Sequence, residues 1–122
     1  MRVIVLLSSL ALALAAGAQA TPPRGTLAGL VTRGPITPVC AVEQPCSEPA
    51  AHVTLVFSHA DRDIARVTTG TDGRYRVRLP ATTYRVRRAG SGAPDRKLEP
   101  HSVLVKAGRL IRIDFSIDTG IR

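Results

Sequence analysis

Five arginines recur at every second position in two neighbouring segments of the chain. Arg74, Arg76 and Arg78 belong to the first segment, and Arg85 and Arg87 belong to the second. Because alternate side chains of a β-strand point to the same face, each segment presents its arginines on one side of a strand. The turn expected at 80–82 predicts that the two strands pair as a hairpin. All five guanidinium groups are therefore expected on one face. We call these five residues the arginine stripe.

The arginine stripe is suited to binding anions. A guanidinium group forms two parallel hydrogen bonds with a phosphate or a carboxylate. Two positive charges about 5 Å apart in water repel by roughly 0.8 kcal/mol, a cost that a bound anion removes. The first hypothesis is therefore a face that binds an anionic polymer, a lipid headgroup or an acidic protein. The second is a solvated face without a partner, since exposed charges also keep sheet edges from pairing with other chains.

The other reactive side chains lack the spacing of a catalytic or metal site. The three histidines, His52, His59 and His101, have neither H-x-H nor H-x-x-x-H spacing, which metal sites often use. Asp61 and Asp63 lack the further acidic ligands and the glycine of a calcium loop. The chain also has no nucleophile elbow for a Ser-His-Asp triad. The sequence therefore predicts no catalytic residue, no metal site and no cofactor.

The first twenty residues have the organisation of a secretory signal peptide. A short basic start precedes an apolar run over 3–16, and small residues lead to Ala-Gln-Ala at 18–20, with cleavage expected after Ala20. The apolar run is shorter than the roughly twenty residues that a membrane-spanning helix needs. The sequence therefore predicts that residues 21–122 are one exported domain without a membrane span. We expect it to be secreted, periplasmic or attached to the cell surface.

Export determines the expected state of the two cysteines, Cys40 and Cys46. In an oxidising compartment a single pair of cysteines is expected to form a disulfide. Closing a loop of about seven residues corresponds to roughly 2.4 kcal/mol of chain entropy. A zinc site would need further ligands, and a redox pair is usually spaced C-x-x-C. We therefore expect a structural disulfide.

Segments with period-two hydrophobicity follow one another through the exported chain. The clearest is 111–118, in which every second residue from Ile111 to Ile117 is apolar. Asp72-Gly73 predicts a hairpin turn, and the proline-rich stretch 33–49 is typical of a loop. Each strand has one apolar face to bury, so the sequence predicts an all-β sandwich of about seven strands. They are expected at 25–32, 51–57, 64–69, 74–79, 84–87, 103–105 and 111–118.

The net charge is the unusual feature of the composition. The 122 residues include 17 Lys and Arg against 9 Asp and Glu, a formal charge of +8, and fifteen of the cations are arginine. Loss of Arg2 with the leader leaves 16 against 9, or +7. Nucleic acid is an unlikely partner because the aromatic residues, which would stack on bases, all fall at inward strand positions. These aromatic residues are Phe57, Tyr75, Tyr84 and Phe115.

Several segments resemble the carboxypeptidase regulatory-like domain. The resemblance rests on Thr-Asp-Gly-Arg-Tyr at 71–75 and on the stretches 25–31, 53–55 and 79–84. It implies a seven-stranded antiparallel Greek-key β-sandwich that is similar to transthyretin in fold. This chain has Thr82 where the family usually has glycine, and its cysteine loop looks like an insertion. The resemblance also implies a domain without activity of its own, because related carboxypeptidases carry their chemistry in a separate metal-binding domain.

One enzyme family, the hydroxyisourate hydrolases, shares the transthyretin-like fold. Those proteins end in Tyr-Arg-Gly-Ser, whereas this chain ends in Asp-Thr-Gly-Ile-Arg over 118–122, so a transthyretin-like hydrolase is disfavoured. We expect a non-catalytic module with a structural or binding role at the cell envelope. The expected partner of the arginine stripe, if it has one, is an anionic envelope polymer or an acidic protein. The sequence makes no prediction of the oligomeric state.

Overall fold

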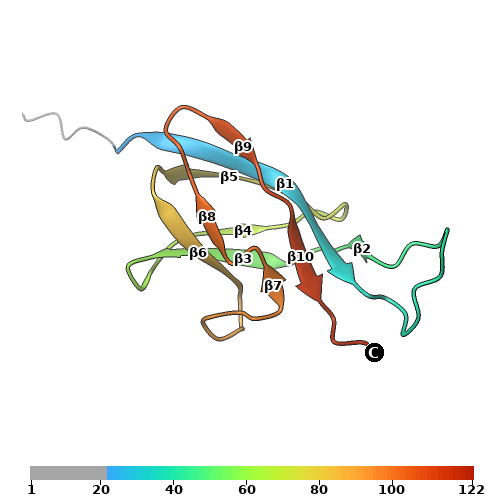
Figure 1. Cartoon of the computed structure of the whole chain (residues 1–122). Coiled ribbons are helices and arrows are strands. Elements are labelled where there is room, and N and C mark those ends of the chain that lie inside the picture. The colour runs from blue at the N-terminus through green and yellow to red at the C-terminus, as the bar shows by residue number, and fades with distance from the viewer. Residues whose placement is uncertain (1–21) are drawn as a thin grey trace, which may run out of the picture.

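Alternation of apolar and polar residues produces ten strands in the part of the chain that the structure describes, residues 22–122. The computed structural model arranges these strands in two sheets that pack face to face, with no helix in this range (Figure 1). No described segment is therefore a helix that is long and apolar enough to cross a membrane. The predicted signal peptide, residues 1–20, lies outside the described residues. The expected all-β sandwich is confirmed.

The long strand β1 is at the centre of the first sheet. Along one edge it pairs antiparallel with β5 and then with β2, and along the other it pairs in parallel with β9 and then with β10. Strand β7 pairs with the outer side of β10. These strands are β1 (Arg24–Gly34), β2 (Glu48–Pro49), β5 (Arg74–Pro80), β7 (Leu98–Glu99), β9 (Leu110–Arg112) and β10 (Phe115–Asp118).

The second sheet is antiparallel throughout, in the order β4-β3-β6-β8. Strands β3 and β4 form a tight hairpin, because Ala60 and Asp61 take positive φ values of 49° and 62°. Two consecutive positive φ values are the geometry of a two-residue type I′ turn, which matches the twist of paired strands. The strands are β3 (Thr54–His59), β4 (Arg62–Thr68), β6 (Thr83–Arg88) and β8 (Ser102–Leu104).

The core lies between the two sheets, and its centre is aromatic. The ring of Phe57 lies 6.3 Å from that of Tyr84 and 6.5 Å from that of Phe115, and Tyr75 lies 5.5 Å from Phe115. All four are at least 95% buried, as the strand pattern predicts. The two tyrosine hydroxyls donate to backbone carbonyl groups, Tyr75 to Ile113 at 2.5 Å and Tyr84 to Pro80. Their burial therefore leaves no polar group unpaired.

The predicted strand over 111–118 is divided in the structure at Ile113 and Asp114. The Asp114 carboxylate accepts a hydrogen bond of 2.9 Å from the Leu30 amide, so a side chain satisfies this donor of β1. Gly29 passes very close at the same point, because an added Cβ would lie 2.0 Å from the Ile113 carbonyl oxygen. Side-chain capping and this close approach separate β9 from β10.

Three further expectations about topology are wrong. The structure has ten strands in the described range rather than seven, and the pairings of β1 with β9 and β10 are parallel rather than antiparallel. The Asp72-Gly73 turn does not close a hairpin, because β4 and β5 belong to different sheets. Gly73, at a φ of 76°, instead turns the chain from one sheet to the other.

Cys40 and Cys46 form the predicted disulfide, with their Cα atoms 5.4 Å apart. The bridge closes part of the long connection between β1 and β2. Figure 1 shows this connection extending away from the two sheets. Its two valines, Val39 and Val42, are 79% and 91% exposed. The cysteine loop thus projects from the sandwich and is not part of its core.

Candidate anion-binding site

The arginine stripe is divided between the two outer faces of the sandwich. Strand β5, which carries Arg74, Arg76 and Arg78, pairs with β1 in the first sheet. Strand β6, which carries Arg85 and Arg87, pairs with β3 and β8 in the second. The prediction that these two strands pair as a hairpin is therefore wrong. The apolar sides of β5 and β6 face each other across the core, which directs their arginines to opposite sides.

On the first sheet, β5 combines with two neighbouring strands to form a larger basic surface. Arg76 and Arg112 are in register on either side of Ala28, and Arg78 is in register with Thr26. Neighbouring strands lie about 4.8 Å apart, so Arg76 of β5 and Arg112 of β9 branch from strands roughly 10 Å apart. The small side chains of β1 form the floor between them. We call this outer side of β5, β1 and β9 the arginine face.

One end of the arginine face is a concavity of about 560 Å³. Four arginines line it: Arg24, Arg76, Arg78 and Arg109. Each is exposed, and among the described residues none of the four forms an ion pair. The other residues that line it include no acidic side chain and no His, Ser or Cys. The concavity thus presents free guanidinium groups and one hydroxyl, that of Thr26, without a general base to activate it.

The other end of the arginine face is neutralised. Arg74 lies 3.7 Å from the Asp72 carboxylate, and Arg112 lies 3.2 Å from that of Asp114. The backbone amide of Leu30 and then the Arg112 side chain donate to Asp114 and hold the pKa of that carboxyl below its usual range. The free positive charge of this face is therefore concentrated at the end where β1 begins.

On the second sheet, Arg87 is already occupied. Its two terminal nitrogens donate to the two carboxylate oxygens of Asp63 at 3.1 and 3.0 Å. The hydrogen bonds from Arg87 and then from Ser58 lower the pKa of Asp63. Arg85 forms no ion pair among the described residues and lines a separate groove. Of the five arginines of the stripe, Arg76, Arg78 and Arg85 are thus free to bind an anion.

Arg24 and Arg109 could not be recognised as members of this face from the sequence. Both lie at the margins of strands, where no periodicity marks them. Arg109 belongs to the turn before β9, in which the Gly108 amide donates to the Arg24 carbonyl at 2.9 Å. This contact, between residues 84 positions apart, brings the two arginines to the same end of β1. Only the parallel pairing of β1 with β9, which no local pattern predicts, places them beside Arg78.

The remaining predicted candidates are dispersed. His52 lies in an exposed turn at a φ of 58°, whereas His59 and His101 line the groove that contains Arg85. Asp61 also lines that groove. Within residues 22–122, no three His, Cys, Asp or Glu side chains gather in a way that could hold a metal ion.

Comparison with models of known protein families gives no match for this chain. Comparison with curated proteins gives none either. Solved structures do match. Part of the TIE protein of Bacillus anthracis is similar, with a TM-score of 0.52 and 18% identity over 79% of this chain and 16% of that one. GBS52, the minor pilin of Streptococcus agalactiae, has a TM-score of 0.50 and 11% identity over 80% of this chain and 45% of that one.

A DUF3823 family protein from Parabacteroides merdae has a TM-score of 0.49 and 18% identity, over 80% of this chain and 47% of that one. This chain therefore spans less than half the length of each of these three structures. At such low identities, the similarity to the TIE protein and GBS52 concerns the fold alone. The chain folds as a β-sandwich of a kind that also occurs within these longer bacterial proteins.

Proposed function

We propose that this protein is a non-catalytic β-sandwich module that binds an anionic polymer of the cell envelope through its arginine face. One observation carries the proposal: four arginines surround a single concavity and have no ion-pair partner among the described residues. Like charges that converge in this way repel one another. A bound anion would remove that repulsion and would satisfy the free guanidinium groups.

The shape of the arginine face supports an extended partner rather than a small ion. The free arginines Arg76 and Arg78 follow one another along β5, where side chains on the same face recur about every 6.7 Å. Their row runs parallel to the floor formed by Thr26 and Ala28. A polymer with regularly spaced charges could lie along β1 and contact several arginines at once. Each contact would release counterions, which favours binding at low salt.

The proposed location rests on independent features of the chain. Residues 1–20 have the pattern of a signal peptide, and the Cys40–Cys46 disulfide fits an oxidising compartment. GBS52, which has a similar fold, is a minor pilin. The proposed family remains the carboxypeptidase regulatory-like domain, on the resemblance of 71–75 and the neighbouring segments. The proposal includes no catalysis, because the concavity lacks a general base that could activate the Thr26 hydroxyl.

Retention on phosphocellulose tests this function. The double substitution Arg76→Ser/Arg78→Ser should lower the salt concentration at which residues 21–122 elute. The matched control is Arg62→Ser/Arg96→Ser, which removes the same charge from two exposed arginines that also lack ion pairs in the described structure. The proposal predicts that Arg76→Ser/Arg78→Ser lowers the salt concentration at elution clearly more than the control pair does. Equal shifts for the two pairs would show that net charge alone governs retention and would refute the proposed face.

A further inference from the structure

A second groove, of about 580 Å³, lies on the outer side of the second sheet. Its floor is a row of three outward side chains from three adjacent strands: Ser58 of β3, Arg85 of β6 and Ser102 of β8. Adjacent strands are about 4.8 Å apart, so a hydroxyl group lies on each side of the Arg85 position. The volume falls within the range of roughly 300–1,000 Å³ that is usual for small-molecule sites.

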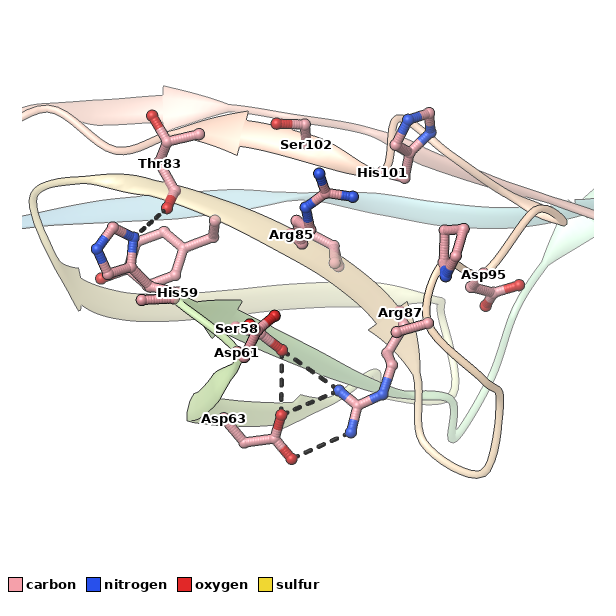
Figure 2. Close-up of a pocket in the computed structure, with 15 residues that line it drawn as sticks. Ser58, His59, Asp61, Asp63, Thr83, Arg85, Arg87, Asp95, His101 and Ser102 are labelled. Carbon is pink, nitrogen blue, oxygen red and sulfur yellow. Dashed lines mark hydrogen bonds and ion pairs between the residues drawn. The ribbon is translucent and has the colours of Figure 1, made fainter.

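The arginine in this row, Arg85, has a free guanidinium group. Its neighbours along β6 are both occupied in the described structure: Arg87 by Asp63 at 3.0 Å and Arg88 by Asp95 at 2.7 Å. Figure 2 shows the guanidinium of Arg87 turned toward Asp63 and Ser58, whereas that of Arg85 points away from them. Arg85 can therefore offer its full pair of parallel donors to a ligand.

The histidine at one end of the groove is held in a defined tautomer. His59 Nδ1 lies 2.9 Å from the Thr83 carbonyl oxygen, which can only accept, so Nδ1 carries the proton (Figure 2). The neutral ring then has Nε2 as an acceptor. Its ring also packs edge-on against Tyr84, with the centroids 6.3 Å apart. His59 is thus placed to accept a hydrogen bond from a donor such as an amide N–H.

The other residues that line the groove indicate which charge and size of ligand it can accept. Ala60, Ala93 and Pro94 supply small apolar surfaces. Asp63 is engaged by Arg87, but Asp61 also lines the groove and forms no ion pair within the described range. A groove with one free guanidinium and one free carboxylate suits a single negative charge better than a multiply charged phosphate. The size and the apolar walls suit a small substituent beside that charge.

We propose that this groove binds a carboxylate attached to a small apolar group, as at the C-terminal end of a short peptide. Arg85 binds the two carboxylate oxygens, and the Ser102 hydroxyl donates to one of them, whereas the Ser58 hydroxyl already donates to Asp63. The substituent packs against Ala93 and Pro94, and His59 Nε2 remains as an acceptor at the opposite end of the groove. This site is on the opposite sheet from the arginine face and does not depend on the function proposed for that face.

Calorimetric titration of residues 21–122 with N-acetyl-Ala-Ala tests the proposal, with the C-terminal amide of the same peptide as control. We expect binding of the free carboxylate and at least a tenfold loss on amidation. Arg85→Gln should cause a loss of at least tenfold as well. Arg96→Gln, which removes the same charge from an exposed arginine outside both proposed sites, should leave this binding unchanged. Asp61→Asn should tighten it, because a like charge is removed.

Two further ligands identify the source of the carboxylate. Binding of glucuronate in place of the peptide, with the same dependence on Arg85, would contradict the proposal, because an acidic sugar lacks the apolar substituent. Binding of inorganic phosphate more tightly than the peptide, if it also depends on Arg85, would overturn the proposal, as would the absence of peptide binding. Equal binding by wild-type protein and Arg85→Gln would also overturn it. The backbone amide NMR spectrum of the Arg85→Gln variant should keep the pattern of the native protein, since the substituted side chain is exposed.

Discussion

Arg78 and Arg85 are only seven positions apart in the sequence, yet they lie on opposite outer faces of the sandwich. Each is next to a buried residue of its own strand, Leu79 and Tyr84, and these two side chains enter the core from opposite sheets. Burial of both apolar faces therefore determines where the charges lie. The arginine face and the Arg85 groove are consequently two surfaces that can be tested separately.

Asp95 is the acidic residue whose loss should most affect stability. It is 4% exposed and accepts hydrogen bonds from the Arg88 side chain at 2.7 and 3.0 Å and from the amides of Arg88 and Lys97. Asp95→Asn leaves a half-buried guanidinium without its counter-charge, and we expect a loss of about 2 kcal/mol in the free energy of unfolding. Urea denaturation measures it. Asp72→Asn, which breaks an exposed pair, should cost under about 0.5 kcal/mol.

The same pair predicts a dependence of stability on pH. The hydrogen bond from the Arg88 side chain, the largest cause, holds the pKa of Asp95 below its usual value. A carboxyl whose pKa is lower in the folded state stabilises the protein above its unfolded pKa. That contribution is lost as the pH falls through the folded pKa. The free energy of unfolding should therefore decrease as the pH is lowered from 5 toward 2. Asp95→Asn should flatten this dependence, and an unchanged slope in the variant would contradict the assignment.

A pair of glycines tests the close approach between β1 and the C-terminal segment. Gly29→Ala would place a Cβ 2.0 Å from the Ile113 carbonyl oxygen, and a backbone atom cannot move away without breaking the sheet. We expect a loss of more than about 2 kcal/mol, measured by thermal or urea unfolding. Gly92→Ala is the matched control, because an added Cβ there meets nothing within 4 Å. Similar stabilities for the two variants would show that the segments do not approach in this way.

The disulfide is open to a direct chemical test. Mass spectrometry after alkylation of the unreduced, unfolded protein should show no added groups, and two should appear after reduction. Cys40→Ser/Cys46→Ser should then lower the free energy of unfolding by up to about 2.4 kcal/mol, the chain-entropy value for so short a loop. Two alkyl groups on the unreduced protein would contradict the bridge.

The local patterns of the sequence predict strands and faces well but not the partners of those strands. Alternation correctly assigns Tyr75 and Tyr84 to the interior and Arg76 and Arg85 to the exterior. It cannot distinguish a turn within a sheet from a turn between sheets, since both need the same residues at 72–73 and 80–82. Asp114 shows a second limit. Its carboxylate accepts a hydrogen bond from a backbone amide of β1, for which alternation predicts a backbone carbonyl as the acceptor. This divides the segment 111–118, which looks like one continuous strand in the sequence.

The same limit explains which parts of the candidate site could be foreseen. Arg76 and Arg78 are visible in the sequence because they share one strand. Arg24 and Arg109 are not, because the parallel pairing of β1 with β9 brings them together from distant parts of the chain. The groove around Arg85 likewise combines residues from β3, β4, β6, β8 and three connections. Sites that depend on pairing between distant strands need the structure.

Chemical-shift mapping tests the central claim most directly. Isotope-labelled residues 21–122 are titrated at low salt with a short polyphosphate, and the backbone amide signals are followed. The account predicts that the largest shifts cluster on β1, β5 and the turn before β9, around Arg24, Arg78 and Arg109, and that they disappear at high salt. Shifts spread evenly over both sheets, or concentrated on β3 and β4, would contradict an anion-binding role for the arginine face.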